Sequence, residues 1–188
     1  MRFRLRVIAV VFALFGAAWC SAQNLALVGA KVCPSPTDSP IEHATVVLHG
    51  ERIVAVGSSA SIRIPPGTKV IDCTGFVVTA GFWNSHVHIL TPGLIHADEL
   101  SPGETTAQLQ AMLTRWGFTT VFDLGSVLEN TNLIRHRIAA GESQGPRILT
   151  VGEPFWIKTP IYIQSFLQAN QVKMPESHSI PEAQQRVK

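Results

Sequence analysis

The succession of apolar segments in the second half of the chain constrains its fold more than any other feature. Residues 118–124 and 147–151 are short apolar runs rich in β-branched side chains, which is typical of buried strands. Helix-period patterns precede the first run, at residues 101–117, and separate the two runs, at residues 130–140. Strands that are apolar on both faces and alternate with helices predict βα units with a parallel sheet.

The first of these helices carries clear end signals. Ser101, Pro102 and Glu104 match the N-cap, N1 and N3 positions of a capping box, and Gly117 fits the position just after the helix. One apolar face of the helix is predicted from residues at i, i+3, i+4 and i+7, namely Leu109, Met112, Leu113 and Trp116. A third helix is expected to begin near Ser179.

The segment before residue 81 has a different pattern. It contains short strand-like runs at residues 25–32, 44–48, 52–56, 70–72 and 76–78, with a predicted hairpin turn at Gly50. Strands at this spacing indicate a small all-β sandwich or half-barrel. We therefore expect a small β domain at residues 23–80 and an α/β domain at residues 81–188.

The N-terminus predicts export. Arg2, Arg4 and Arg6 precede an apolar run at residues 7–18, and small residues lead to an expected cleavage site ahead of Gln23. Twelve apolar residues are too few to span a bilayer comfortably. Residues 1–22 are thus predicted to be a signal peptide that leaves no stable membrane insertion after cleavage, with a periplasmic or secreted product.

Composition excludes one class of partner and leaves one question open. Net charge is only +2, and no cluster of lysine and arginine is interleaved with aromatic residues, so nucleic-acid binding has no support. After cleavage two cysteines remain, Cys33 and Cys73. They are read either as a disulfide, which an exported protein can form, or as two buried free thiols.

His86 and His88 form the strongest candidate site. Two histidines at i and i+2 on an extended segment project from the same face, and neutral imidazoles suit zinc, iron or nickel. The alternative is one buried and one solvated histidine at a strand end. The pair follows an apolar, glycine-punctuated run at residues 76–85, which favours a metal ligand role.

Four stretches of the chain resemble the amidohydrolase superfamily, in particular its exported imidazolonepropionase-like and prolidase-like members. They are residues 50–57 (GERIVAVG), 70–88 (VIDCTGFVVTAGFWNSHVH), 117–125 (GFTTVFDLG) and 145–149 (GPRIL). The resemblance implies an incomplete (β/α)₈ TIM barrel, strands 1–3, after the small β domain. It further implies a hydrolase that cleaves a C–N bond of a cyclic amide or dipeptide-like substrate by means of a metal-activated water.

Within that resemblance only His86 and His88 correspond to metal ligands. One or two divalent ions, zinc above all, are implied, and the other ligands would be a lysine or glutamate, two histidines and an aspartate from strands 4 to 8. Since this chain is expected to end before strand 4, its catalytic residue is unknown. Asn84 stands where the family has an aspartate that would orient a ligand histidine.

Several other residues are weaker candidates. Asp123 ends a predicted strand and is either a structural buried acid or a partner that orients a ligand. His96, Trp156 and Tyr162 are candidates for a substrate pocket, against the alternatives of a solvated loop histidine and of core packing.

Three functions remain in competition at this point. The first is a metal-dependent amidohydrolase, and the second is a catalytically inactive fragment or weak metal-binding module. The third is a non-catalytic, β-rich interaction protein. Three barrel strands alone would leave apolar faces uncovered, so self-association is also expected.

Overall fold

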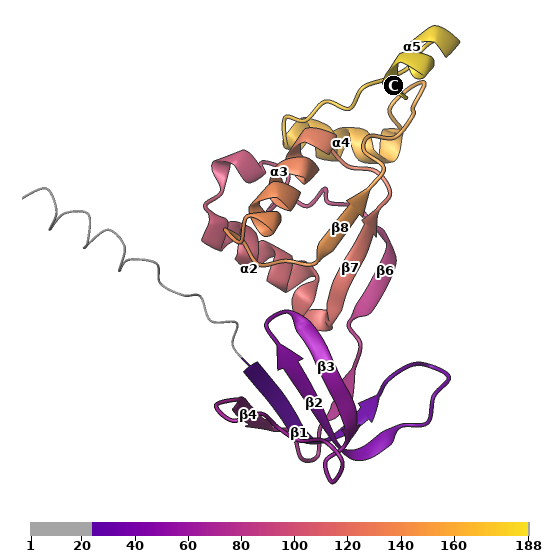
Figure 1. Ribbon diagram of the computed structural model, residues 1–188. Coiled ribbons are helices and arrows are strands. Elements are labelled where there is room, and N and C mark those ends of the chain that lie inside the picture. Colours follow the sequence, from indigo (N-terminus) through magenta and orange to yellow (C-terminus); the bar gives the residue numbers. More distant parts are fainter. Residues whose placement is uncertain (1–23, 188) are drawn as a thin grey trace, which may run out of the picture. The chain divides into compact units, whose positions relative to one another are not determined.

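The computed structural model describes residues 24–187 (Figure 1). The predicted signal peptide, residues 1–22, lies outside the described residues. The chain divides into two compact units, Met1–Ala80 and Gly81–Lys188. The first is built of strands, and the second combines strands with helices, so the protein is of mixed α/β class.

The first unit is one five-stranded sheet. Its strand order is β3-β2-β1-β4, and β5 also pairs with β1. The pairs β1–β2 and β2–β3 are antiparallel, whereas β4 and β5 run parallel to β1. The strands are β1 (Asn24–Cys33), β2 (Ile41–His49), β3 (Arg52–Ser58), β4 (Lys69–Asp72) and β5 (Val77–Thr79).

The predicted sandwich is wrong in one respect, because the described strands form a single sheet. β4 pairs with Leu25–Val28 of β1, and β5 pairs with the later residues Lys31–Cys33. Two short strands that share one long neighbour extend the same sheet and do not build a second layer. The core of this unit is accordingly small, and several apolar side chains of the sheet remain exposed, including Ile53, Val54, Val70, Ile71 and Val77.

The two cysteines are free thiols. Cys73 donates its N–H to the Val28 carbonyl, while Cys33 lies at the far end of β1, opposite Thr79. Because Asp72 pairs with Val28, Cys73 lies beside the next residue of β1, Gly29. Cys33 is four residues further along β1, a distance of about 13 Å. This exceeds the roughly 7 Å between Cα atoms that a disulfide can bridge. The structure therefore favours the free-thiol alternative.

The second unit contains a parallel sheet of order β6-β7-β8. Its strands are β6 (Phe82–Val87), β7 (Phe118–Asp123) and β8 (Arg147–Thr150). The helices α2 (Pro102–Met112) and α3 (Leu128–Ala139) connect them, as the alternating pattern predicts. The core lies between these helices and the sheet, where Leu109 and Ile134 pack against Val87, Val121 and Ile148.

Helix α2 begins and ends largely as the sequence predicts. The Ser101 hydroxyl accepts the Glu104 N–H, and the Glu104 carboxylate accepts the Ser101 N–H, which confirms the capping box. The Ser101 hydroxyl and the Ser101 N–H both donate to the Glu104 carboxylate, and they hold its pKa below the usual value. The helix stops at Met112, and a 3₁₀ turn η2 (Thr114–Trp116) leads to Gly117, which has a positive φ of 84°. This tighter turn leaves Trp116 exposed, so its predicted place on the buried face is wrong.

Two further helices follow β8. Helix α5 (Ile180–Arg186) begins after Ser179 as predicted, whereas α4 (Ile161–Ala169) was not predicted. A short 3₁₀ turn, η1 (Ala97–Glu99), precedes α2. The helices count against a protein built only of strands. In residues 24–187 we find no helix with both the length and the apolar character needed to cross a bilayer.

We predict that the start of β6 tolerates only glycine. A Cβ on Gly81 would lie 2.7 Å from the Thr119 Cβ on β7, whereas a Cβ on Gly103 would meet nothing within 4 Å. Overpacking should make Gly81→Ala lower the free energy of unfolding by about 1–3 kcal/mol. The control Gly103→Ala should raise it by about 0.4–1 kcal/mol. Urea denaturation followed by circular dichroism measures both, and equal effects would contradict the packing described.

Candidate functional site

The histidine pair lies where β6 loses its regular register. Asn84 pairs with Val121 and Val87 with Asp123, so β6 carries one more residue than β7 over this interval. Such a bulge re-aims side chains at the end of a strand. His86 and His88 are both exposed there, at the carboxyl end of the parallel sheet.

The spacing of the two rings suits a shared metal ion. Their centroids are 5.3 Å apart and their planes are inclined by 77°. Two imidazoles bound to one tetrahedral zinc, with nitrogens about 2.0–2.1 Å from the ion, have ring centres about 5 Å apart. The pair thus fits two positions of such an ion.

The ring of His88 is held in one orientation. Its Nδ1 lies 2.8 Å from the Gly125 carbonyl oxygen. Because a carbonyl only accepts hydrogen bonds, Nδ1 carries a proton, and in the neutral ring Nε2 then has the lone pair. A backbone carbonyl that accepts the second ring N–H is a common support for a metal-binding histidine. The observed bond therefore suits a ligand that binds through Nε2.

His86 is supported through its backbone. Asn84 accepts the His86 N–H with its Oδ1 at 3.1 Å. The sequence suggested that Asn84 orients a ligand ring, whereas the structure places its side-chain oxygen on the main chain of the histidine. Asn84 thereby fixes the bulge from which the His86 side chain projects.

Asp123 ends β7 and is fully buried. Its Oδ1 accepts the Ser126 hydroxyl at 2.7 Å and, over longer distances, the N–H groups of Gly125 and Ile89. Its Oδ2 accepts the Thr150 hydroxyl at 2.9 Å. The carboxylate thus joins β6, β7 and β8 at their carboxyl ends. It is linked to His88 indirectly, since it accepts hydrogen bonds from Gly125 and Ser126, which contact the His88 ring and the Ile89 N–H.

Sequence reasoning missed three contributors to this arrangement. The Gly125 carbonyl and the Ser126 and Thr150 hydroxyls have no individual sequence signature. Gly125 does belong to one of the four amidohydrolase-like stretches, and its φ of 153° explains a glycine at that position. That stretch was the only signal in the sequence for this turn.

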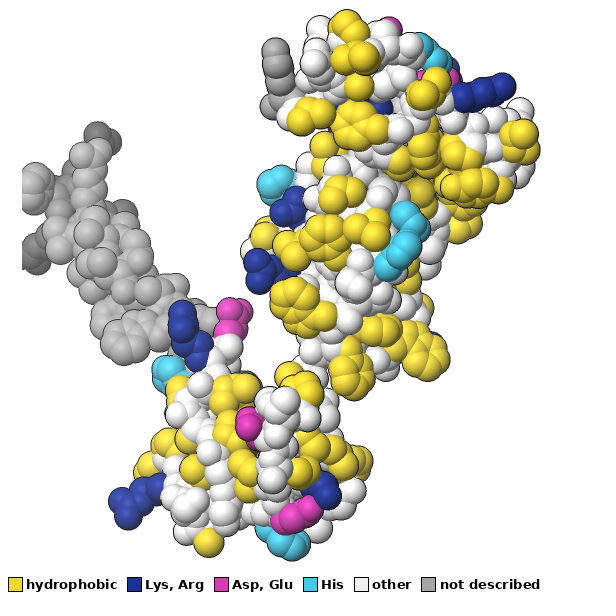
Figure 2. Space-filling model, turned by 90° about the vertical axis from the view of Figure 1, so that its right-hand side faces the viewer, with side chains coloured by type: hydrophobic (Ala, Val, Ile, Leu, Met, Phe, Trp, Pro, Cys, Tyr) yellow, Lys and Arg dark blue, Asp and Glu magenta, His cyan; other side chains and the backbone are white. Residues whose placement is uncertain are grey.

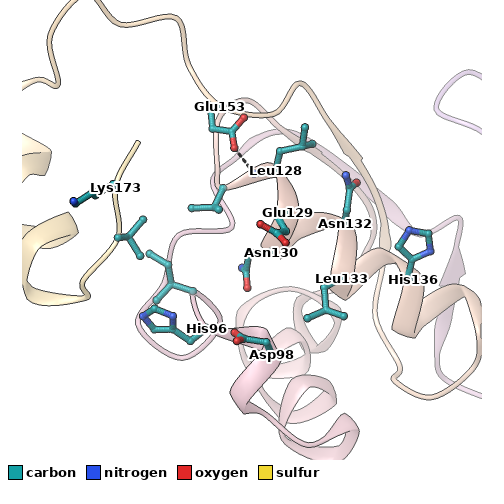
Figure 3. Close-up of a pocket in the computed structure, with 13 residues that line it drawn as sticks. His96, Asp98, Leu128, Glu129, Asn130, Asn132, Leu133, His136, Glu153 and Lys173 are labelled. Carbon is teal, nitrogen blue, oxygen red and sulfur yellow. Dashed lines mark hydrogen bonds between the residues drawn. The ribbon is translucent and has the colours of Figure 1, made fainter. Parts of the chain in front are cut away.

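His96, a candidate pocket residue, belongs to a different hollow. Its Nε2 donates to the Asn170 carbonyl at 2.7 Å, and it lines a cavity of about 940 Å³ between η1 and the start of α3 (Figure 3). Glu153 borders the same cavity and accepts the Leu128 N–H at the N-terminus of α3. None of His86, His88, Trp156 and Tyr162 lines this cavity.

Trp156 and Tyr162 are placed apart from each other. Trp156 forms a backbone bridge to Glu176, and its carbonyl accepts the Ser177 N–H. Tyr162 lies in the first turn of α4 with 82% of its surface exposed. Their roles as substrate contacts stay predictions.

Apolar side chains are exposed widely over the second unit, and Figure 2 shows them gathered in several places on the face it presents. They include Phe82, Trp83, Val151, Phe155, Ile157 and Ile161. Surfaces of this kind mark sites of interaction or ligand binding more often than plain solvent-facing surface.

The two histidines have no third candidate metal ligand beside them in the described residues. Residues 24–187 contain no group of three histidine, cysteine, aspartate or glutamate side chains placed to hold a metal ion. Catalytic zinc sites usually have three protein ligands. The pair alone therefore falls short of such a site.

Comparison with known proteins finds relatives in sequence and in structure. No family model matches the chain. A dihydroorotase of Lactobacillus helveticus is 28% identical over 106 residues, which cover 55% of this chain and 22% of that protein. An allantoinase of Enterococcus faecalis is 38% identical over 79 residues, or 42% of this chain and 16% of that protein. The structure of a putative prolidase from Bifidobacterium longum superposes with a TM-score of 0.67 and 25% identity, covering 88% of this chain and 37% of the other.

The chain is thus similar in sequence and fold to the N-terminal part of amidohydrolase-superfamily proteins. The matched stretches cover about a fifth of the length of the curated amidohydrolases. The resemblance of the four sequence stretches is thereby confirmed at the level of the superfamily.

For this chain we predict measurable but weak binding of Zn²⁺ that depends on both histidines. His86→Ala and His88→Ala should each weaken it by more than the roughly 10- to 100-fold that loss of a supporting partner costs. His136→Ala is the matched control, since His136 is exposed on α3 and lies outside the pair. Competition with a chromogenic chelator gives the affinities. Equal binding by all three variants would rule out a site at the pair.

Proposed function

We propose that this chain contributes the first two metal ligands to a metal-dependent hydrolase of C–N bonds. The hydrogen bond from His88 Nδ1 to the Gly125 carbonyl carries the proposal, because it leaves Nε2 open beside a second imidazole. The relatives support the reaction class, since those with curated names are amidohydrolases that act on small-molecule amides.

In this proposal the chain forms strands 1–3 of a (β/α)₈ barrel. β6, β7 and β8 run parallel in sequential order with helices between them, which is the pattern of such a barrel. The histidine pair lies at the carboxyl end of the first strand, the end where barrel enzymes carry their active sites. Remaining ligands would come from strands 4 to 8 of the same barrel.

The proposed chemistry assigns distinct tasks to the residues present. His88 offers Nε2 from a fixed ring, and His86 offers a ring that projects from the bulge. A bound divalent ion, for which zinc is our first choice, supplies Lewis acidity and lowers the pKa of a bound water. Exposed apolar residues near the strand ends, such as Val151, are suited to cover the apolar part of a cyclic amide or dipeptide.

The test is hydrolysis by the protein expressed from its complete gene. We expect metal-dependent cleavage of a cyclic amide, such as dihydroorotate or allantoin, or of a proline-containing dipeptide. A chelator should abolish it, and His86→Asn and His88→Asn should each lower kcat/KM by at least roughly 100-fold. His136→Ala should retain it. Undiminished cleavage in both ligand variants would contradict the proposal.

A weak metal-binding module is the second candidate, favoured by the two-ligand count in residues 24–187. It predicts that zinc binds and that none of these substrates is cleaved. Failure of both binding and cleavage would overturn both functions and leave an inactive protein.

We further propose export directed by residues 1–22. The arginine-rich start and the short apolar run support it. Expression in a bacterial host should yield periplasmic protein whose N-terminal sequence begins at Gln23. Protein that stays in the cytoplasm with Met1 in place would contradict this, and a chain lacking residues 2–22 serves as the control.

A further inference from the structure

One turn, residues 123–126, contacts both the ring of His88 and the backbone N–H of the residue after it. The Gly125 carbonyl accepts the ring Nδ1–H, and the Ser126 hydroxyl accepts the N–H of the next residue, Ile89, at 2.7 Å. The ring and the backbone that carries it are thereby tied to the same four residues. Both contacts are made by groups of the chain itself.

The position of the Gly125 carbonyl depends on two features. Gly125 has a φ of 153°, and a Cβ at this position would approach the Pro154 Cγ to 2.9 Å. Its N–H points to Asp123 Oδ1 at 3.3 Å. Glycine therefore permits the conformation, and Asp123 provides a fixed acceptor on the opposite side of the residue from the histidine.

Asp123 also sets the direction of the Ser126 hydroxyl. This hydroxyl donates its single proton to Asp123 Oδ1, so that its lone pairs face the Ile89 N–H. The carboxylate itself is anchored on the other oxygen by Thr150 from β8. One buried acid thus orders both of the groups that hold His88.

We propose that Asp123 is a positioning residue for His88. Through Ser126 and the Gly125 peptide it keeps the proton of the neutral ring on Nδ1 and leaves the Nε2 lone pair for a metal ion. The effect of Asp123 on the tautomer of His88 does not depend on the proposed function, whereas its effect on metal binding rests on that function. A residue that only stabilised the core would not alter the His88 tautomer, whereas a positioning residue should change which ring nitrogen of His88 carries the proton.

Thr105 offers a control of equal burial. It is fully buried on α2, where its hydroxyl donates to the Ser101 carbonyl and accepts from Arg137. Its hydrogen bonds have no partner in the 123–126 turn. Thr105→Val should therefore cost stability without altering His88.

The first measurement is a long-range ¹H–¹⁵N spectrum of the metal-free chain at about pH 8.5, where ordinary imidazole is neutral. The His88 signals are identified by their loss in His88→Gln. We expect the pattern of a ring protonated at Nδ1, and an Nε2-protonated ring in the unsubstituted protein would overturn the proposal.

The second measurement compares variants. Asp123→Ala and Ser126→Ala should shift His88 toward a mixture of tautomers and weaken Zn²⁺ binding by about 10- to 100-fold. Asp123→Asn, which keeps one acceptor oxygen, should retain most of both properties, and Thr105→Val should retain all. Ser126→Ala removes no charge partner, so it serves as the test if Asp123→Ala does not fold.

An unchanged tautomer and Zn²⁺ affinity in Ser126→Ala, as in Thr105→Val, would overturn the positioning role. Loss of hydrolysis alone would count only against the proposed function, because the tautomer is measured without metal or substrate. The two ideas can therefore fail separately.

Discussion

The second unit depends on how a single buried carboxylate is satisfied. Asp123 carries its oxygens into a region without solvent, where an uncompensated charge costs several kcal/mol. Hydroxyl and amide donors from Ile89, Gly125, Ser126 and Thr150 offset that cost. These four residues belong to the ends of strands or to the turns after them, and Thr131 on α3 adds a longer hydrogen bond of 3.5 Å to Oδ2. Meeting this requirement therefore brings the carboxyl ends of β6, β7 and β8 together.

The same requirement makes the two histidines unequal. His88 is fixed at its ring and at the following amide, whereas the only side-chain hydrogen bond to His86 that the structure gives is at its backbone N–H. A side chain that is already held in place loses less conformational entropy on binding than one whose ring has no such hydrogen bond. The bulge in β6 separates these two behaviours over only three residues.

Local patterns in the sequence were sufficient for elements whose signals are local. The Ser101 capping box and the run that forms β7 required no knowledge of the rest of the fold. Helix α4 was not foreseen, since it starts after Pro160 without a capping side chain and exposes Ile161. The single sheet of the first unit was not foreseen either. Both β4 and β5 pair with β1, and the sequences of these two short strands contain no signal for their partner.

In the candidate site, too, the features with a local sequence signal could be predicted and the others could not. A pair of histidines at i and i+2 at the end of a strand is readable because side-chain identity and strand periodicity define it. The groups that orient His88 are a backbone carbonyl and a small hydroxyl, and any sequence contains many of both. Only the pairing of β6 with β7 brings Gly125 and Ser126 to the histidine, across 37 residues in each case. The candidate histidine can thus be found from sequence, whereas the groups that hold its ring come together only through the pairing of the strands.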